Sequence, residues 1–100
     1  MLNKNIETFI GCDKEYFEAD TVIFGAPFDS TVSYRPGARF ASKAMRSESF
    51  GLETYSPYSE KDLNDINVFD GGDLELCFGN TDKTLSEIEN FTAKLLTDKK

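Results

Sequence analysis

Three aspartates that follow apolar segments are the residues of this chain with the clearest chemical potential. Asp29 comes shortly after the apolar run Thr21–Ala26, and Asp70 and Asp73 come directly after a second run, Ile66–Phe69. Carboxylates of this kind could together hold a metal ion. Aspartates beside glycines are more often turn residues, however, so a metal site made only of these carboxylates is the less favoured interpretation.

Three arginines lie in the segment after the first apolar run, and they offer the aspartates partners. The guanidinium of Arg35, Arg39 or Arg46 could form bidentate bonds with a carboxylate. For each aspartate we therefore favour a pairing with one of these arginines, or with backbone N–H groups. Arg39 and Arg46 are seven residues apart and would share a helix face if the helix begins early enough to include Arg39; there they could tie the loop down or meet a neighbouring subunit.

The two apolar runs predict the strands that position these residues. Both runs are short and rich in β-branched and aromatic residues, with apolar side chains at successive positions. A strand that is apolar on both faces is covered on both faces, which is typical of a parallel sheet. In such sheets ligands bind beyond the carboxyl ends of the strands, so the loops that carry Asp29, Asp70 and Asp73 would point at the site.

A loop and a helix are predicted between the two strands. Pro36-Gly37 reads as a turn. Ser42 is a plausible N-cap of a helix that runs to about Phe50, with Gly51 as the residue that ends it. The spacing of Ala41, Ala44 and Met45 predicts its apolar face.

A second helix is predicted near the end of the sequence. Thr84 with Glu87 three residues later matches a capping box. One apolar stripe follows at helical spacing: Leu85, Ile88, Phe91, Leu95 and Leu96.

Composition excludes several classes of function. The formal net charge of −7 disfavours nucleic acids and anionic membranes but is compatible with a small cationic ligand. The chain has no histidine, which excludes a Ser-His-Asp triad and histidine-based zinc sites within it. Cys12 and Cys77 lack metal-ligand spacing and read as two reduced thiols. The sequence shows no pattern of a signal peptide or of a membrane-spanning helix, so we expect a cytoplasmic protein.

The order strand, helix, strand, helix predicts an α/β fold with a mainly parallel sheet. Two strands alone are marginal, and a parallel sheet needs cover on both faces. The pattern therefore calls for a further strand. We expect residues 1–100 to form the first part of one larger α/β domain.

A family resemblance supports this expectation. The stretch GAPFDSTVSYRPGARFASKAMR, followed by DGGDLELCFGN, resembles the N-terminal part of agmatinases in the arginase/agmatinase (ureohydrolase) family. The shared features are the strand that ends in G-x-P-F-D, the R-P-G-x-R loop, the A-x-R helix, a G-D turn and a later G-N. The likeness runs from about Val22 to Leu96.

The resemblance implies a three-layer αβα enzyme that carries two Mn²⁺ ions and hydrolyses agmatine to putrescine and urea, a step of polyamine biosynthesis. It also implies a homo-oligomer, a trimer or hexamer, and a small cationic guanidino substrate. Agmatine, guanidinobutyrate, formiminoglutamate and arginine all stay open as that substrate.

The family's metal-ligand motifs, of the G-G-E-H, D-A-H-x-D and D-x-D-x-x-D-P kinds, are absent from this sequence. We therefore assign no catalytic or metal-binding residue to residues 1–100 and expect them to be inactive alone. A supporting or site-rim role is expected for five residues: Asp29, Arg35, Arg39, Asp70 and Asp73. The alternative is a non-catalytic α/β module for binding or assembly.

Overall fold

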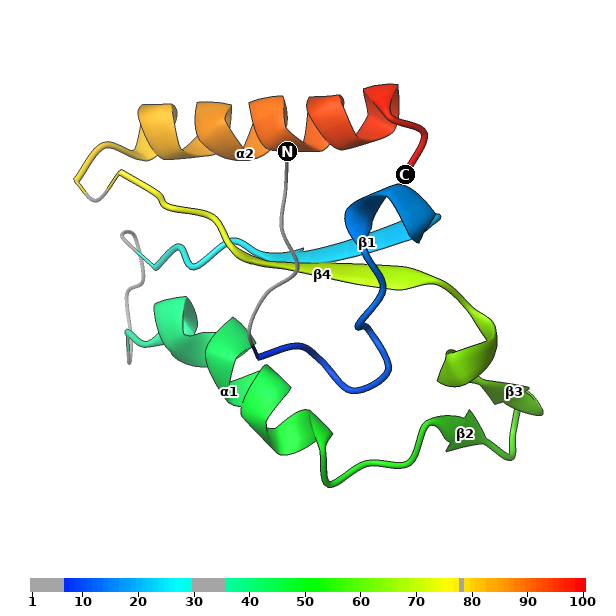
Figure 1. The fold of residues 1–100 in the computed structure, drawn as a ribbon. Helices are drawn as coiled ribbons and strands as arrows, with labels where there is room; N and C mark the ends of the chain where they lie inside the picture. The colour runs from blue at the N-terminus through cyan, green and yellow to red at the C-terminus, as the bar shows by residue number, and fades with distance from the viewer. Residues whose placement is uncertain (1–6, 30–35, 78) are drawn as a thin grey trace.

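The structure is a computed structural model that describes residues 7–29, 36–77 and 79–100. A two-stranded sheet lies at its centre, between two helices (Figure 1). The helices and strands are β1 (Thr21–Gly25), α1 (Ala41–Ser49), β2 (Tyr55–Ser56), β3 (Lys61–Asp62), β4 (Val68–Asp73) and α2 (Thr81–Thr97). Short 3₁₀ turns occur at Tyr16–Glu18, Ala38–Phe40 and Leu63–Asp65.

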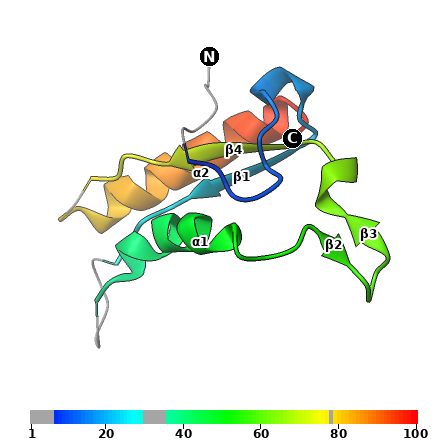
Figure 2. The same ribbon diagram turned by 60° about the horizontal axis from the view of Figure 1, so that its bottom comes forward.

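The central sheet pairs β1 with β4 in parallel, as the apolar runs predicted. The two helices cover opposite faces of it, α1 on one side and α2 on the other (Figures 1 and 2). Phe24 of β1 packs edge-to-face against Phe91 of α2, with ring centroids 4.8 Å apart. The helices therefore cover both faces, which is the arrangement expected for a parallel sheet.

Strand β4 differs from the predicted second strand. It begins at Val68, so Ile66 lies outside it, and it continues through Asp70 to Asp73 where a turn was expected. The glycines bend the strand without ending it, because Gly72 has a φ of 75° beside a register shift between Ile23 and Gly25 of β1. The Asp70–Asp73 segment is thus an irregular stretch of strand and not a loop.

Helix α1 turns a different face to the sheet from the one predicted. A 3₁₀ turn leads directly into it, so Phe40 occupies the N-cap position and Ser42 lies inside the helix. Ala41, Ala44 and Met45 are exposed, whereas Arg46 and Ser49 are buried. The prediction failed because the sheet beneath this helix offers carboxylates as partners. Gly51 follows the helix as expected, but its φ is not positive.

Helix α2 begins four residues earlier than the capping-box pattern indicated, at Thr81. Its N-cap is Asn80, whose side-chain oxygen accepts a hydrogen bond from the Lys83 N–H at 3.0 Å. Thr84 lies within the helix, and its hydroxyl donates to the Cys77 carbonyl at 2.8 Å. The capping box of Thr84 and Glu87 is therefore wrong, because a stronger N-cap residue precedes it.

The apolar stripe of α2 is only partly buried. Leu95 is buried, and Ile88 and Phe91 are half-buried. Leu85 and Leu96, which are 11 residues apart and so lie on the same side of the helix, are 52% and 67% exposed. The sheet of this chain thus covers one part of the stripe and leaves the other open to solvent.

The segment that precedes β1 lies along the outer edge of β4. Asp13 forms an isolated antiparallel bridge with Phe69, and the Lys14 N–H donates to the Val68 carbonyl at 3.1 Å. Sequence patterns did not indicate this pairing, because the segment 9–14 has no strand-like alternation.

The turn-rich connection between α1 and β4 contains a small hairpin of β2 and β3 that projects from the rest of the fold (Figure 2). The hairpin was not predicted, since each strand has only two residues. Its tip carries Tyr58, which is 99% exposed.

The core formed by the described residues is small. Its buried apolar residues are Cys12, Ala19, Val68, Phe69 and Leu95. Large apolar side chains such as Phe40, Met45 and Phe50 remain exposed. Cys12 and Cys77 are not joined by a disulfide. Among the described residues, no helix combines the length and hydropathy needed to cross a bilayer.

The end of α2 is tied to the 3₁₀ turn before β1. The Tyr16 hydroxyl donates to Asp98 at 2.5 Å, and this bond, together with burial, raises the pKa of Tyr16 to about 12. Because folding raises this pKa, the bond's contribution to stability is complete below pH 10 and is lost as the pH rises through 12. We expect Asp98→Asn to return the Tyr16 titration, followed by absorbance at 295 nm, toward pH 10. An unchanged titration curve would contradict this bond.

Candidate functional site

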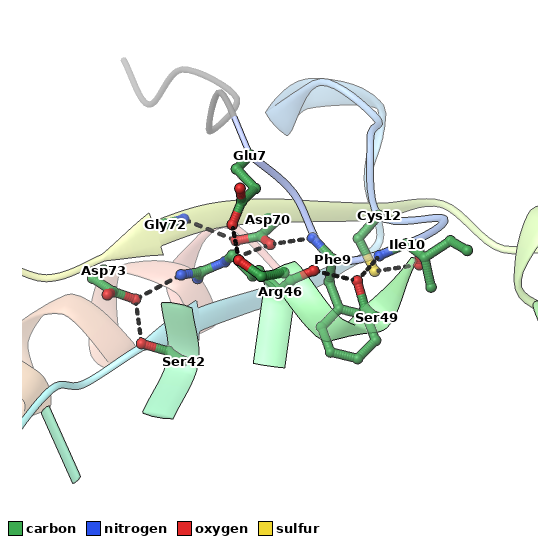
Figure 3. A network of polar contacts seen from close by, with 11 residues as sticks. Glu7, Phe9, Ile10, Cys12, Ser42, Arg46, Ser49, Asp70, Gly72 and Asp73 are labelled. Carbon is green, nitrogen blue, oxygen red and sulfur yellow. Dashed lines mark hydrogen bonds and ion pairs between the residues drawn. The ribbon is translucent and has the colours of Figure 1, made fainter. Parts of the chain in front are cut away.

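A buried arginine joins two aspartates of β4 to helix α1 (Figure 3). The Nε of Arg46 donates to Asp70 Oδ2 at 2.9 Å, and its Nη1 donates to Asp73 Oδ1 at 2.8 Å. The side chain of Asp70 is fully buried, and that of Arg46 is 7% exposed. Asp73 Oδ1 also accepts a hydrogen bond from the Ser42 hydroxyl at 2.7 Å. Ser42 and Arg46, one helical turn apart in α1, therefore both bind the last residue of β4.

The same cluster also holds the segment before β1. Asp70 Oδ2 accepts the backbone N–H of Phe9 at 2.8 Å, and Asp70 Oδ1 accepts that of Gly72 at 2.9 Å. The Ser49 hydroxyl donates to the Arg46 carbonyl at 2.7 Å and accepts the N–H of Ile10 at 3.0 Å (Figure 3). The carboxylate of Asp70 is thus fully engaged without any ligand.

The electrostatics of the cluster favour the charged forms of Arg46 and Asp73. Burial lowers the pKa of Arg46, but its hydrogen bonds to Asp70 and Asp73 outweigh burial and raise that pKa above its ordinary value. Burial raises the pKa of Asp73, yet hydrogen bonds from Arg46 and Ser42 outweigh it and leave the pKa below its ordinary value. Nearby, burial and the charge of Asp70 raise the pKa of the Cys12 thiol, which keeps this cysteine protonated and unreactive.

A second ion pair links the segment after β1, at Asp29, with Arg39. Asp29 is buried and lies four residues beyond the strand. Arg39 Nη1 lies 3.2 Å from Asp29 Oδ1 and 3.3 Å from Oδ2, and the Arg39 backbone N–H donates to the same carboxylate at 3.4 Å. The guanidinium also stacks over the Phe40 ring at 4.7 Å. This pair joins Asp29 to the 3₁₀ turn that precedes α1.

The predicted site residues therefore fall into two groups. Asp29 and Asp73 lie at the carboxyl ends of β1 and β4, where the strand pattern placed them. Asp70 does not, because it lies in the middle of β4 opposite Ile23. The favoured pairing of each aspartate with an arginine or backbone N–H is what the structure contains. Arg35 lies outside the described residues.

Comparison with known proteins places this arrangement in a family. The model of the arginase family matches residues 19–100. The chain belongs to the arginase family. It is 48% identical over 90 residues to an agmatinase of Bacillus subtilis, and 31% identical over 78 residues to an N(1)-aminopropylagmatine ureohydrolase of Thermococcus kodakarensis. The first match covers 90% of this chain and 31% of that relative, and the second covers 78% and 27%.

The arginase-family fold is confirmed by a solved structure. The crystal structure of the agmatine ureohydrolase of Thermoplasma volcanium superposes with a TM-score of 0.88 at 29% identity. That superposition covers 96% of this chain and 32% of the other. The chain thus spans about a third of the length of the arginase-family proteins it matches.

The described residues do not fit the manganese ions that arginase-family membership implies. No group of three or more histidine, cysteine or acidic side chains among them could hold a metal ion. Asp70 and Asp73 are occupied by Arg46, and Asp29 by Arg39. We therefore derive no metal-dependent step from this chain.

Sequence reasoning missed Ser42 and Ser49 as members of the Arg46 cluster. The three residues are spaced i, i+4 and i+7, which puts them on one face of a helix. That polar stripe was the available signal. It was overlooked because the apolar spacing of Ala41, Ala44 and Met45 favoured the neighbouring face.

Proposed function

We propose that residues 1–100 are the N-terminal part of a single arginase-family α/β domain, in a manganese-dependent amidinohydrolase that converts agmatine and water to putrescine and urea. The observation that carries this proposal is the 48% identity to an agmatinase over 90 residues. The small core and the exposed apolar side chains of both helices support it, because a complete domain would cover them.

Under this proposal the chain helps to position the loops of the active site and provides no catalytic or metal-binding residue. Bound manganese ions would supply an activated water for attack on the guanidinium carbon, and residues outside this chain would hold them. The ion pairs of Asp29 with Arg39 and of Asp73 with Arg46 would set the position of the loops at the carboxyl ends of β1 and β4. We assign Asp70 a supporting role beneath these loops. We also propose that Arg35, in the loop that follows β1, contributes to the rim of the site.

The substrate would be a small guanidino cation, which the acidic character of the chain favours. We further propose that the enzyme is a cytoplasmic homo-oligomer of three or six subunits that serves polyamine biosynthesis. The alternative, a non-catalytic α/β module, is favoured by one observation only: the described residues contain no group that could hold a metal ion.

The test is a urea-release assay on the purified longer protein with Mn²⁺ and agmatine, beside a chelator-treated control. We expect urea release that depends on the metal and prefers agmatine to arginine and guanidinobutyrate. N(1)-aminopropylagmatine belongs in the same panel, because a relative is named for that substrate. Absence of urea with every guanidine would favour the non-catalytic module.

A further inference from the structure

The outer edge of β4 is the side of this strand that faces away from β1. On the inner side, the Asn67 carbonyl accepts the Thr21 N–H at 3.3 Å. The next carbonyl, that of Val68, points the other way and accepts the Lys14 N–H at 3.1 Å. Because the backbone groups of a strand alternate in direction, those of Asp70 also face outward. Unpaired groups along a strand edge are a template for pairing with a further strand.

Residues 9–16, which we call the guard segment, cover this edge. One part of the segment is held by an isolated antiparallel bridge between Asp13 and Phe69. Its beginning is held by a side chain, because Asp70 Oδ2 accepts the Phe9 N–H at 2.8 Å (Figure 3). The guard segment is therefore attached partly through a buried side chain of the strand that it covers.

The same carboxylate also closes the edge from within. Asp70 Oδ1 accepts the Gly72 N–H at 2.9 Å, so this donor has a partner on its own strand. Gly72 has a φ of 75° beside the register shift of the β1–β4 pairing, an irregularity that bends the edge. The Asp70 side chain is fully buried and pairs with Arg46. Bulges, inward-pointing charges and covering loops are the features with which native sheets avoid edge-to-edge pairing, and all three meet at Asp70.

Loss of the guard segment would uncover apolar surface as well as backbone groups. Phe69 is 0% exposed, and the ring of Tyr16 packs edge-to-face against it with the centroids 5.3 Å apart. Arg46 binds the carboxylates of both Asp70 and Asp73, which offsets part of the negative charge of the strand. An uncovered β4 would thus combine free backbone groups, an exposed aromatic ring and reduced charge.

A second copy of β4 fits such an edge by symmetry. Two identical strands can pair antiparallel about a two-fold axis, and the contact is then isologous, since the same surface is used on both copies. We propose that the guard segment prevents the outer edge of β4 from pairing with β4 of a second copy, and that Asp70 is the residue that holds the segment in place. The proposal depends on the contacts at this edge and not on the proposed function.

The experiment compares two truncations of the longer protein that contains this chain. One lacks residues 1–16, and the control lacks residues 1–6 and so keeps the guard segment. Sedimentation velocity at rising protein concentration measures the mass of each. We expect the protein without the guard segment to reach about twice the mass of the control or more, because isologous pairing joins two copies. Equal masses at every concentration, with both proteins folded by circular dichroism, would overturn the proposal.

A peptide of residues 7–16 tests the role of Asp70 in the same assay. Added to the protein that lacks residues 1–16, it should occupy the edge and restore the mass of the control. Phe9→Pro in the peptide removes the N–H that Asp70 accepts, so about tenfold more of this peptide should be needed. Equal potency of the two peptides would refute the role of Asp70. Self-association that neither peptide reverses would mean pairing through another surface, and would overturn the guard itself.

The intact longer protein decides the question if the truncated one does not fold. Phe9→Pro in the full chain should increase the mass at high concentration, whereas Tyr58→Ala, at the exposed tip of the hairpin, should leave it unchanged. A folded Phe9→Pro variant that keeps the wild-type mass throughout would overturn the proposal. None of these measurements uses urea release, so failure here and failure of the proposed function are told apart.

Discussion

Replacement of Arg46 by methionine is expected to abolish the structure around Asp70. The substitution keeps a long side chain but leaves the fully buried Asp70 carboxylate without its cation. Removing one partner of a buried ion pair costs about 3–5 kcal/mol. Whole domains are stable by only about 5–15 kcal/mol, and the small core of this chain places it low in that range or below it.

Hydrogen exchange of two amides reports this effect directly. Phe9 and Gly72 both donate to Asp70, so their protection should fall to the level of an unstructured peptide in Arg46→Met. The matched control is Arg39→Met, which breaks the half-exposed pair with Asp29. Neither amide donates to Asp29, and Arg46 keeps its bond to Asp70 in this variant, so the same two amides should stay protected. Equal protection in wild type and Arg46→Met would refute the assigned role.

A double variant separates the charge effect from general loss of packing. Asp70→Asn removes the buried negative charge and keeps one oxygen acceptor. In the Arg46→Met background it should recover part of the lost protection, because no uncompensated charge remains. A further loss in the double variant would mean that Arg46 acts through packing alone.

The two strands of the central sheet could be predicted from the sequence because their signal is local. The run from Thr21 is β-branched and aromatic at successive positions, and it forms β1 as expected. The same reasoning placed the start of β4 two residues early, since Ile66 is apolar but lies outside the strand. It then ended β4 at Phe69, because an isolated Asp-Gly-Gly reads as a turn. Only the pairing with β1 and Arg46 keeps that segment in the sheet.

The orientation of α1 could not be read from its own residues. Apolar spacing favoured the face of Ala44 and Met45 as the buried one. In the structure, Ser42 and Arg46 face the sheet and hydrogen-bond to aspartates of β4. The partners of Arg46 lie 24 and 27 residues away, so their positions depend on tertiary structure. Sequence reasoning named the correct class of interaction, aspartate with arginine, but not the pairs. The family resemblance supplied the fold that two strands alone could not specify.

Gly25 is expected to tolerate no side chain, for a reason that is steric and not conformational. A Cβ at this position would lie 2.0 Å from Asp73 Oδ1 and within 2.8 Å of the Ser42 side chain. Its φ is not positive, so backbone strain plays no part. Gly25→Ala must therefore displace Asp73 from Arg46 and shift the start of α1, and overpacking of this kind costs about 1–3 kcal/mol.

The measurement is hydrogen exchange of the Leu74 amide, which donates to the Gly25 carbonyl, and of the Arg46 Nε–H. Both should exchange about five- to a hundredfold faster in Gly25→Ala, as that cost implies. Gly51→Ala is the control, because its Cβ would meet only the Glu48 carbonyl at an ordinary 3.5 Å.

Coupling between Gly25 and Asp73 provides the sharper test. If Gly25→Ala already expels Asp73 from its bonds, then adding Asp73→Ala removes an interaction that no longer exists. The double variant should exchange no faster than about the worse of the two single variants. Additive losses would mean that Asp73 keeps its bond to Arg46 despite the new methyl group, and that the contact between strand and helix is looser than its distances indicate.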